Sequence, residues 1–309
     1  MKKNKTAVII GFGASGRRHA KILKTLKVFD SIYVVTKQKN IGYKKATINE
    51  LLKINPDYFV ICSETYKHIN HLNFINNNFS KKKILVEKPI FEKFYNFKSK
   101  NNKIYIAYNF RFHPVINFLK NFCKNKKIWV AHASCASYLP NWRKNISYKN
   151  SYSSNKDKGG GVLLDLSHEF DYLTWVLGKL KMNYSYYNKI SNLKIKSKDF
   201  LFFSGSSHKS KIVQIILNYF SKISKRCIVL EGKDFYIYAD LLKNFIRVNI
   251  GNKSKIIRYS NDSLKNSYVI EHKKILSNQT KDLCKYKEAL DLNKLFDQII
   301  KKDKNLNIN

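Results

Sequence analysis

Residues 6–19 read Thr-Ala-Val-Ile-Ile-Gly-Phe-Gly-Ala-Ser-Gly-Arg-Arg-His, an apolar run that leads directly into a glycine-rich turn. The run has the composition of a buried β-strand, and the residues after the turn have the pattern of a helix. In this context the glycines allow a tight turn, and the start of the helix offers unpaired N–H groups to a pyrophosphate. An ordinary glycine turn is the alternative. We expect a dinucleotide to bind at Gly11, Gly13, Ala14, Ser15 and Gly16.

Short β-rich runs alternate with helical patterns over the first part of the chain, which is typical of parallel βαβ units with helices on both faces of a sheet. The expected strands are Thr6 to Ile10, Ile32 to Thr36, Tyr58 to Cys62, Ile84 to Val86 and Ile104 to Ala107. The expected helices are Ser15 to Lys27, Thr47 to Ile54 and Tyr66 to Asn77. The fold class is therefore α/β, beginning with a Rossmann domain over residues 1–113.

The second part of the chain changes character, because residues 182–249 mostly alternate apolar and polar side chains. This alternation predicts a large, mostly antiparallel sheet in a second α/β domain over residues 114–309. An apolar stripe over residues 162–177 predicts one continuous helix. A second stripe predicts a C-terminal helix over about 286–302 that packs back on the body.

Charge and composition narrow the possible partners and the compartment. The net charge is +38, but 52 Lys stand against 7 Arg and are spread along the whole length, so a dedicated nucleic-acid site is not indicated. The longest apolar runs are too short to span a membrane, and we expect a soluble protein. The 5 cysteines are scattered without CxxC spacing, which favours a reducing, cytoplasmic location and argues against a disulfide framework or a zinc site.

The choice between NAD and NADP depends on the end of the second strand. An NAD-preferring site usually places Asp or Glu about 20 residues after the glycine-rich turn, to bind the ribose 2′-hydroxyl. Thr36 and Lys37 stand there instead, and a hydroxyl beside an ammonium can bind a 2′-phosphate. The sequence therefore leans towards NADP and leaves NAD open.

Other chemistry-bearing residues follow the later strands, where an open parallel sheet binds its ligands. They are Ser63, Thr65 and His68, then Glu87 with Lys88, then Asn109 with Arg111. Lys88 lies between a strand end and a proline, where it could meet the nicotinamide. His68 and His71 resemble a metal-ligand pair, but no third ligand has a suggestive spacing, and we expect no metal.

A glycine triplet, residues 159–161, comes just before the helix that the stripe over 162–177 predicts. Helical geometry would place Asp165, His168 and Tyr172 on one face of that helix, away from its leucines. With the glycines permitting close approach, these side chains could form the wall of a cleft.

Taken together, the motifs resemble the Gfo/Idh/MocA family of oxidoreductases over nearly the whole chain. The matching segments are residues 11–19, 62–68, 87–89, 108–112 and 160–178. One departure is the spacing from Asp165 to His168, which is three here and four in the family, so that Glu169 stands where the family spacing puts the imidazole. A stretch around Trp142 and Arg143, followed by Tyr152, resembles members associated with bacterial surface-sugar synthesis.

The resemblance implies hydride transfer between a nicotinamide and a secondary alcohol or ketone of a sugar or nucleotide-sugar. It implies that Lys88 and His168 act in catalysis, with Asp165 orienting them. It also implies substrate binding by Asn109, Arg111, Trp142, Arg143 and Tyr152. Because the antiparallel sheet would expose one face, we expect association into a homo-oligomer through the C-terminal sheet. A redox-assisted glycosidase or eliminating enzyme of the same fold, or a non-catalytic dinucleotide-binding regulator, is the alternative.

Overall fold

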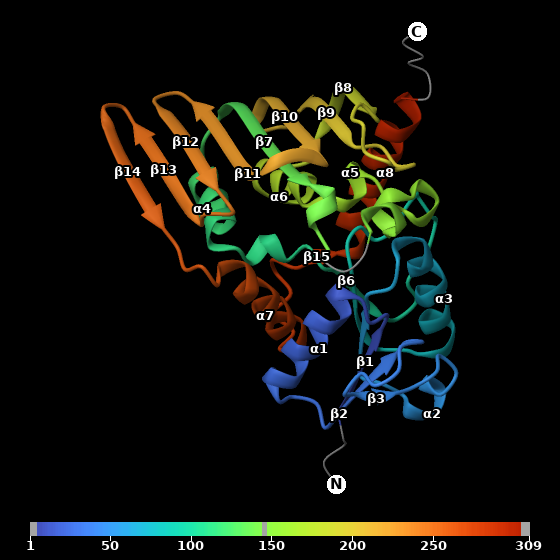
Figure 1. The fold of residues 1–309 in the computed structure, drawn as a ribbon. Helices are drawn as coiled ribbons and strands as arrows, with labels where there is room; N and C mark the ends of the chain where they lie inside the picture. The colour runs from blue at the N-terminus through green and yellow to red at the C-terminus, as the bar shows by residue number, and fades with distance from the viewer. Residues whose placement is uncertain (1–4, 144–146, 304–309) are drawn as a thin grey trace. The chain divides into compact units, whose positions relative to one another are not determined.

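The computed structural model describes residues 5–143 and 147–303, and the chain divides into two compact units (Figure 1). Unit 1 comprises residues up to 108 together with 268–293, and unit 2 comprises residues 109–267 together with the chain from 294 onwards. The sequence-based boundary at 113/114 had placed residues 268–293 in the second domain, whereas the structure groups them with unit 1.

Unit 1 is built on a seven-stranded sheet in which all neighbouring strands are parallel except the pair β15 and β6. The strands are β1 (Thr6–Ile10), β2 (Ser31–Val35), β3 (Lys44–Lys45), β4 (Tyr58–Ile61), β5 (Lys83–Val86), β6 (Lys103–Ile106) and β15 (Cys284–Lys285). Their spatial order is β15-β6-β5-β4-β1-β2-β3. The chain thus builds outwards from β1 to one side, returns, and continues with β4 on the other side. This reversal is the topological switch point at which doubly wound sheets bind their ligands.

The central strands of unit 1 are buried on both faces. Ala7, Val8 and Ile9 of β1 have no exposed surface, and neither do Phe59, Val60 and Ile61 of β4. Their cover comes from α1 (Ala14–Leu26) and α7 (Ser263–Leu276) on one side and α3 (His68–Asn78) on the other (Figure 1). A short helix, α2 (Leu51–Ile54), follows β3. The predicted Rossmann-like sheet is confirmed.

Unit 2 contains an eight-stranded sheet with the order β14-β13-β12-β11-β7-β10-β9-β8. Its strands are β7 (Ile128–Tyr138), β8 (Lys181–Asn188), β9 (Phe200–Ser206), β10 (Ser210–Asn218), β11 (Phe220–Gly232), β12 (Phe235–Asp240), β13 (Phe245–Ile250) and β14 (Lys253–Arg258). All neighbours are antiparallel except β7 and β10, so the predicted mostly antiparallel sheet is confirmed.

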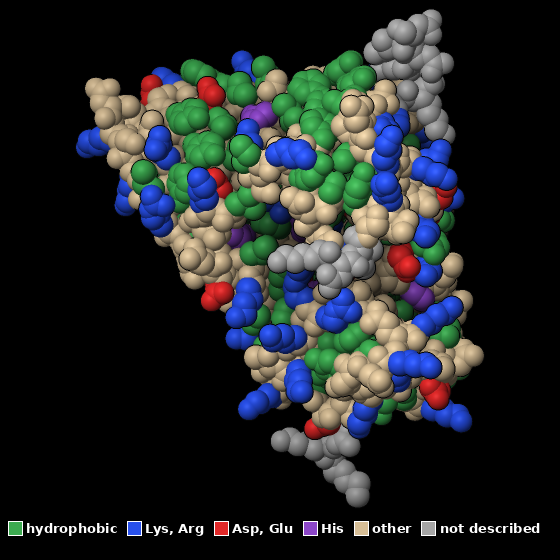
Figure 2. Space-filling view, in the orientation of Figure 1, with side chains coloured by type: hydrophobic (Ala, Val, Ile, Leu, Met, Phe, Trp, Pro, Cys, Tyr) green, Lys and Arg blue, Asp and Glu red, His purple; other side chains and the backbone are tan. Residues whose placement is uncertain are grey.

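The two faces of this second sheet differ. One face packs against α5 (Val162–Asp165) and α6 (His168–Leu177), and α6 in turn contacts α4 (Pro114–Phe122). The other face keeps Tyr184, Ile212 and Tyr236 exposed, and apolar side chains gather over these strands in Figure 2. An apolar sheet face of this kind is typical of an association surface.

The remaining elements are α8 and several short 3-10 turns. Helix α8 (Tyr286–Asp303) begins in unit 1 and ends in unit 2. The residues of its predicted apolar stripe are all buried: Ala289, Leu292, Leu295, Phe296 and Ile299. The 3-10 turns are η1 (Thr65–Lys67), η2 (Asn109–Phe112), η3 (Leu139–Asn141), η4 (Tyr148–Asn150), η5 (Tyr152–Ser154) and η6 (Lys156–Lys158). Within the described residues, no helix has both the length and the apolar character needed to cross a bilayer.

One local prediction is wrong. The continuous helix expected over residues 162–177 is two helices, α5 and α6, because the backbone leaves helical geometry at Leu166 (φ −102°, ψ 35°). Both helices are buried almost all round, so their leucine stripe does not mark a single buried face. Because of this break, Asp165 lies on α5 and does not share a helix face with His168 and Tyr172 of α6.

Candidate functional site

Gly11 lies at the switch point of the first sheet, directly after β1. Its φ of +94° is a conformation that side-chain-bearing residues rarely adopt. A Cβ added there would stand 2.6 Å from the backbone nitrogen of Ser63 and 2.7 Å from the carbonyl carbon of Cys62, at the end of β4. Only glycine therefore lets the two central strands end this close to each other.

The other two glycines of the turn play different parts. A Cβ on Gly16 would stand 2.1 Å from the carbonyl oxygen of Gly11, so this glycine allows α1 to pack closely on the turn. For Gly13, no described atom lies within 4 Å of the position its Cβ would take. The missing side chain of Gly13 thus leaves space that the protein itself does not fill, as the approach of a pyrophosphate requires.

The start of α1 suits an anion. No described side chain caps this helix, its first turn contains no acidic residue, and Arg17 and Arg18 follow within that turn. Unpaired N–H groups and the positive end of the helix dipole attract negative charge at such a terminus. These residues therefore fit the diphosphate of a dinucleotide, as the sequence predicts.

Beside this turn, the loop after β2 carries Thr36, exposed Lys37 and Gln38. The Thr36 hydroxyl accepts a hydrogen bond from the Gln38 backbone N–H (3.2 Å). The Gln38 side-chain amide and the Arg17 guanidinium both donate to the carbonyl oxygen of Phe12 (3.1 and 3.0 Å). Arg17 and Gln38 were not identified from the sequence, because neither belongs to a spacing pattern.

Residues after β4 form a hydrogen-bonded loop. The two ring nitrogens of His68, which is 1% exposed, lie 3.0 Å from the carbonyl oxygens of Ser63 and Ile90. The Ser63 hydroxyl lies 3.0 Å from a ring nitrogen of His71, and Thr65 is buried. Burial lowers the pKa of His68, and it lowers that of His71 to about 4. His68 thus links the loops that follow β4 and β5. Contact between His68 and a cofactor stays a prediction.

Glu87 and Lys88 follow β5, and both are half-buried. The Glu87 carboxylate accepts a hydrogen bond from His19 on α1 (3.1 Å) and another from the Lys88 backbone N–H (3.2 Å). Burial alone would raise the pKa of Glu87, but the His19 hydrogen bond and the charges of Lys88 and Arg18 lower it to about 2. A fixed negative charge therefore stands beside the predicted catalytic lysine.

In unit 2, Asp165 is 6% exposed and is surrounded by phenol groups. Tyr219 donates to its carboxylate at 2.5 Å, and Tyr152 is also hydrogen bonded to it. Burial, followed by the charge of Asp165, raises the pKa of Tyr219 and of Tyr187. Tyr219 lies 54 positions from Asp165, and this separation hid the contact from sequence reasoning.

The glycine triplet explains how this cluster closes. A Cβ on Gly160 would stand 2.2 Å from the carbonyl oxygen of Tyr152, and one on Gly161 (φ +124°) would stand 2.6 Å from the Tyr187 hydroxyl. Both positions therefore exclude a side chain. The close approach that the triplet suggested takes place against the protein's own tyrosines and their loop.

Two predicted substrate residues adjoin the same cluster. The Trp142 ring meets Tyr219 edge-on at 5.2 Å, and its indole N–H donates to Ser137 (2.9 Å). The Arg143 guanidinium lies 5.2 Å from the centre of the Tyr152 ring. The structure thus gathers Trp142, Arg143, Tyr152 and Asp165 at one place in unit 2.

His168 begins α6 and packs edge-on against Phe110 (4.8 Å between ring centres). The next residue, Glu169, has no exposed surface, and its carboxylate forms an ion pair with Arg226 (2.7 Å). The Glu169 carboxylate is therefore paired inside the protein. Glu169 stands at the position where the spacing of the resembled family would put the histidine. Arg226 was not identified from the sequence.

The two residues predicted to bind substrate from the 108–112 segment are almost fully buried. The Arg111 guanidinium makes a two-pronged ion pair with Asp171 of α6 (2.7 to 3.1 Å). The side-chain amide of Asn109 donates to Ser267 (2.7 Å), and no described group satisfies its carbonyl oxygen. In this structure the Arg111 charge is used to hold α6, and direct contact with a sugar stays a prediction.

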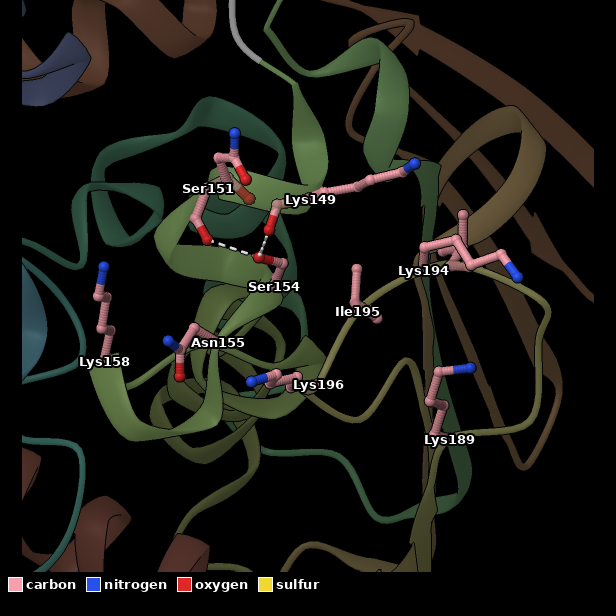
Figure 3. Close-up of a pocket in the computed structure, with 11 residues that line it drawn as sticks. Lys149, Ser151, Ser154, Asn155, Lys158, Lys189, Lys194, Ile195 and Lys196 are labelled. Carbon is pink, nitrogen blue, oxygen red and sulfur yellow. Dashed lines mark hydrogen bonds between the residues drawn. The ribbon is translucent and has the colours of Figure 1, made fainter.

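A cavity of about 700 Å³ lies between the turns over residues 149–158 and the loop over residues 189–196 (Figure 3). Among the described residues, its lining contains no carboxylate and five lysines: Lys149, Lys158, Lys189, Lys194 and Lys196. Such a lining favours an anionic group. Within the described residues, no group of three or more His, Cys, Asp or Glu side chains could hold a metal ion.

Comparison with solved structures shows the same fold in sugar dehydrogenases. The structure of levoglucosan dehydrogenase in complex with NADH superposes with a TM-score of 0.81 at 10% identity, covering 98% of each chain. UDP-N-acetylglucosamine 3-dehydrogenase from Acidithiobacillus ferrooxidans matches with a TM-score of 0.74 at 13% identity, covering 96% of each chain. An oxidoreductase from Thermotoga maritima matches with a TM-score of 0.76 at 15% identity, covering 98% of each chain.

At these identities the likeness establishes the fold. No family model matches the sequence, and no curated protein matches it. Levoglucosan dehydrogenase has also been solved with NADH and levoglucosan and with NADH and L-sorbose. These names give NADH as the bound cofactor and lend no support to the NADP preference that Thr36 and Lys37 suggested.

Proposed function

We propose that the protein is a nicotinamide-dependent oxidoreductase that transfers a hydride between the cofactor and a secondary alcohol or ketone of a sugar or nucleotide-sugar. The observation that carries the proposal is the glycine-rich turn at the switch point. Gly11 and Gly16 are required by the packing of the protein itself, whereas the space beside Gly13 is left open. The shared fold with sugar dehydrogenases supports the same conclusion.

The residues that would hold the cofactor are those at the carboxyl ends of the first strands. The turn over residues 11–16 would bind the diphosphate, the loop from Thr36 to Gln38 the adenosine ribose, and Ser63, Thr65, His68, Glu87 and Lys88 the nicotinamide half. We take the cofactor as NAD(H), because the neighbours with a named cofactor contain NADH. When bound, the nicotinamide supplies the acceptor or donor of the hydride.

Three residues would act on the substrate. The His168 imidazole would exchange the proton of the reacting hydroxyl, and the Lys88 ammonium would polarise the same oxygen. Asp165 would orient a sugar hydroxyl through its carboxylate, which is already an acceptor for Tyr219 and Tyr152.

The substrate side favours a charged sugar derivative. Trp142, Arg143 and Tyr152 lie together with Asp165, and an aromatic and cationic surface suits the apolar face and the phosphate of such a substrate. The lysine-lined cavity would suit the diphosphate of a nucleotide-sugar. Asn109 and Arg111 complete the proposed set, and surface-glycan synthesis in the cytoplasm is the proposed setting.

Association through the second sheet belongs to the same proposal. Ile212 and Tyr236 are 44% and 37% exposed on one face, and a second copy of the chain would cover them. Light scattering on the wild type and on Ile212→Lys tests this. A monomeric wild type at micromolar concentration would contradict the proposal.

The experiment for the proposed activity is a panel of free and nucleotide-activated sugars, with absorbance of the reduced nicotinamide as readout. We expect turnover by the wild type, and a loss of at least about 10²-fold in Lys88→Met and in His168→Ala with the cofactor still bound. The matched control is Lys93→Met, an exposed lysine that should keep its turnover within about 2-fold.

Other outcomes of this panel would favour the rival functions. Product formed without net reduction of added cofactor would favour a redox-assisted glycosidase or eliminating enzyme. Cofactor binding without turnover of any sugar would favour a regulator. Near-wild-type turnover in both variants would defeat the assignment of Lys88 and His168.

A further inference from the structure

Hydrogen bonds join four side chains of unit 1 end to end, three of them buried and the fourth, Glu87, half-buried. The Tyr58 hydroxyl on β4 lies 2.9 Å from Nδ1 of His272 on α7, and Nε2 of His272 lies 2.7 Å from Nδ1 of His19 on α1. Nε2 of His19 lies 3.1 Å from the Glu87 carboxylate at the end of β5. Tyr58 is 1% exposed and both histidines are 0% exposed, so water does not compete for the contacts among these three side chains.

The series of hydrogen bonds from Tyr58 to Glu87 has a defined direction when both imidazole rings are neutral. The ionised Glu87 can only accept, so His19 donates from Nε2 and accepts at Nδ1. His272 must then donate from Nε2 and accept at Nδ1, and the Tyr58 hydroxyl donates to that nitrogen. Burial raises the pKa of Tyr58 and lowers that of His272, which keeps the phenol protonated and the His272 ring neutral. Each N–H of the two rings and the Tyr58 O–H then donates one hydrogen bond, and each unprotonated ring nitrogen accepts one.

This series of hydrogen bonds ends on Glu87, the residue that precedes the proposed catalytic lysine, Lys88. One oxygen of Glu87 receives the His19 N–H, and the other receives the backbone N–H of Lys88 (3.2 Å). The carboxylate is therefore held from two sides. A change of tautomer at His19 would point a lone pair at the carboxylate and release it.

We propose that Tyr58, His272 and His19 are positioning residues, which fix the Glu87 carboxylate and through it the backbone turn that presents Lys88. The catalytic part of this inference rests on the proposed function. The histidine tautomers that the inference requires do not depend on the proposed function. No role was assigned to these three residues from the sequence, in which His19 and His272 are 253 positions apart.

The first test is nuclear magnetic resonance of the whole protein labelled with ¹⁵N-histidine, at neutral pH. We expect His19 and His272 each to carry a proton on Nε2 and to accept a hydrogen bond at Nδ1. A protonated His19 would instead donate from both nitrogens and leave His272 with its proton on Nδ1. That pattern, or a Nδ1–H tautomer at either ring, overturns the proposal, whatever the protein is found to catalyse.

The second test separates positioning from a general loss of fold. His272→Leu removes the donor to His19, whereas His272→Gln offers an amide N–H near the place of Nε2. We expect kcat to fall about 10- to 100-fold in the leucine variant and to recover to within about 5-fold in the glutamine variant, with the Kd of NADH unchanged in both. Equal kcat in the two variants, at equal stability, overturns the proposal.

Tyr58→Phe provides a milder change if His272→Leu does not fold. It removes only the hydroxyl that holds the His272 tautomer, and it should lower kcat several-fold. The matched control is Tyr105→Phe, a 5% exposed tyrosine on β6 of the same sheet, which should leave kcat unchanged. Equal kcat in Tyr58→Phe and wild type overturns the proposal. A wild type that turns over no sugar contradicts the proposed function, while the tautomer measurement still decides the arrangement of the chain.

Discussion

Replacing Gly13 by alanine should separate cofactor binding from stability. The backbone of Gly13 (φ −73°, ψ −160°) is open to any residue, and no described atom lies within 4 Å of the new Cβ. Gly→Ala at such a position leaves the folded state unstrained and reduces the entropy of the unfolded chain. The free energy of unfolding should therefore stay the same or rise by up to about 1 kcal/mol.

The same methyl group would stand where a pyrophosphate has to approach. We expect the Kd of NADH to rise at least about 10-fold, which corresponds to about 1.4 kcal/mol of binding free energy. The assay is a calorimetric titration with NADH, next to urea unfolding of the same preparations.

Gly16→Ala and Gly11→Ala provide the contrast. Their Cβ atoms would stand 2.1 Å from the Gly11 carbonyl oxygen and 2.6 Å from the Ser63 backbone nitrogen, so each should lower the free energy of unfolding by about 1–3 kcal/mol. If Gly13→Ala binds NADH as the wild type does, the turn is not the diphosphate site. If it unfolds as easily as Gly16→Ala, the open space beside Gly13 is not as described.

Three further predictions concern unit 2. Arg111→Met should lower the free energy of unfolding, measured in urea, by about 3–5 kcal/mol, because the buried Asp171 carboxylate would lose its Arg111 partner. Adding Asp171→Leu should recover most of the loss, and an additive double variant would contradict this. Burial lowers the pKa of His113 to about 4, so the unfolded chain binds a proton at higher pH than the native chain, and stability should fall by about 3 kcal/mol as pH drops from 6.5 to 4. His113→Gln should remove that part of the slope, and an unchanged pH profile would disprove it. Tyr219→Phe should raise KM for the sugar several-fold by removing the Tyr219 hydrogen bond that holds the Asp165 carboxylate, with NADH affinity unchanged. Steady-state kinetics would show the reverse if Tyr219 served the cofactor.

Local patterns account for what the sequence predicted well. The first strand, the glycine-rich turn and the first helix are adjacent in the chain, and β1 (Thr6–Ile10) has the bounds that were predicted. The apolar stripe of α8 was also predictable, because its spacing repeats within a single helix.

Contacts between distant residues account for what it missed. The partners of Asp165 and of His19 lie 54 and 253 positions away, and no spacing rule connects them. Helix α7, which supplies His272, was not predicted at all. The break at Leu166 escaped prediction because both short helices are buried all round, so that their apolar residues fit one continuous stripe.

The partner of each charged side chain could not be predicted from the sequence either. Arg111 was predicted to bind the substrate, and in the structure its guanidinium is paired with Asp171. Glu169 stands one position after His168, and its carboxylate is paired with Arg226. Residue type indicates what a side chain can bind, but only packing selects the partner.

The most direct test of the central claim follows the hydride itself. Sugars deuterated on carbon are incubated with NAD⁺ and the wild-type protein, and the recovered cofactor is analysed by mass spectrometry. The account predicts one deuterium on the nicotinamide ring, formed at least about 10²-fold more slowly by Lys88→Met. Reduced cofactor without deuterium, or deuterium transfer at the same rate in both proteins, would contradict it.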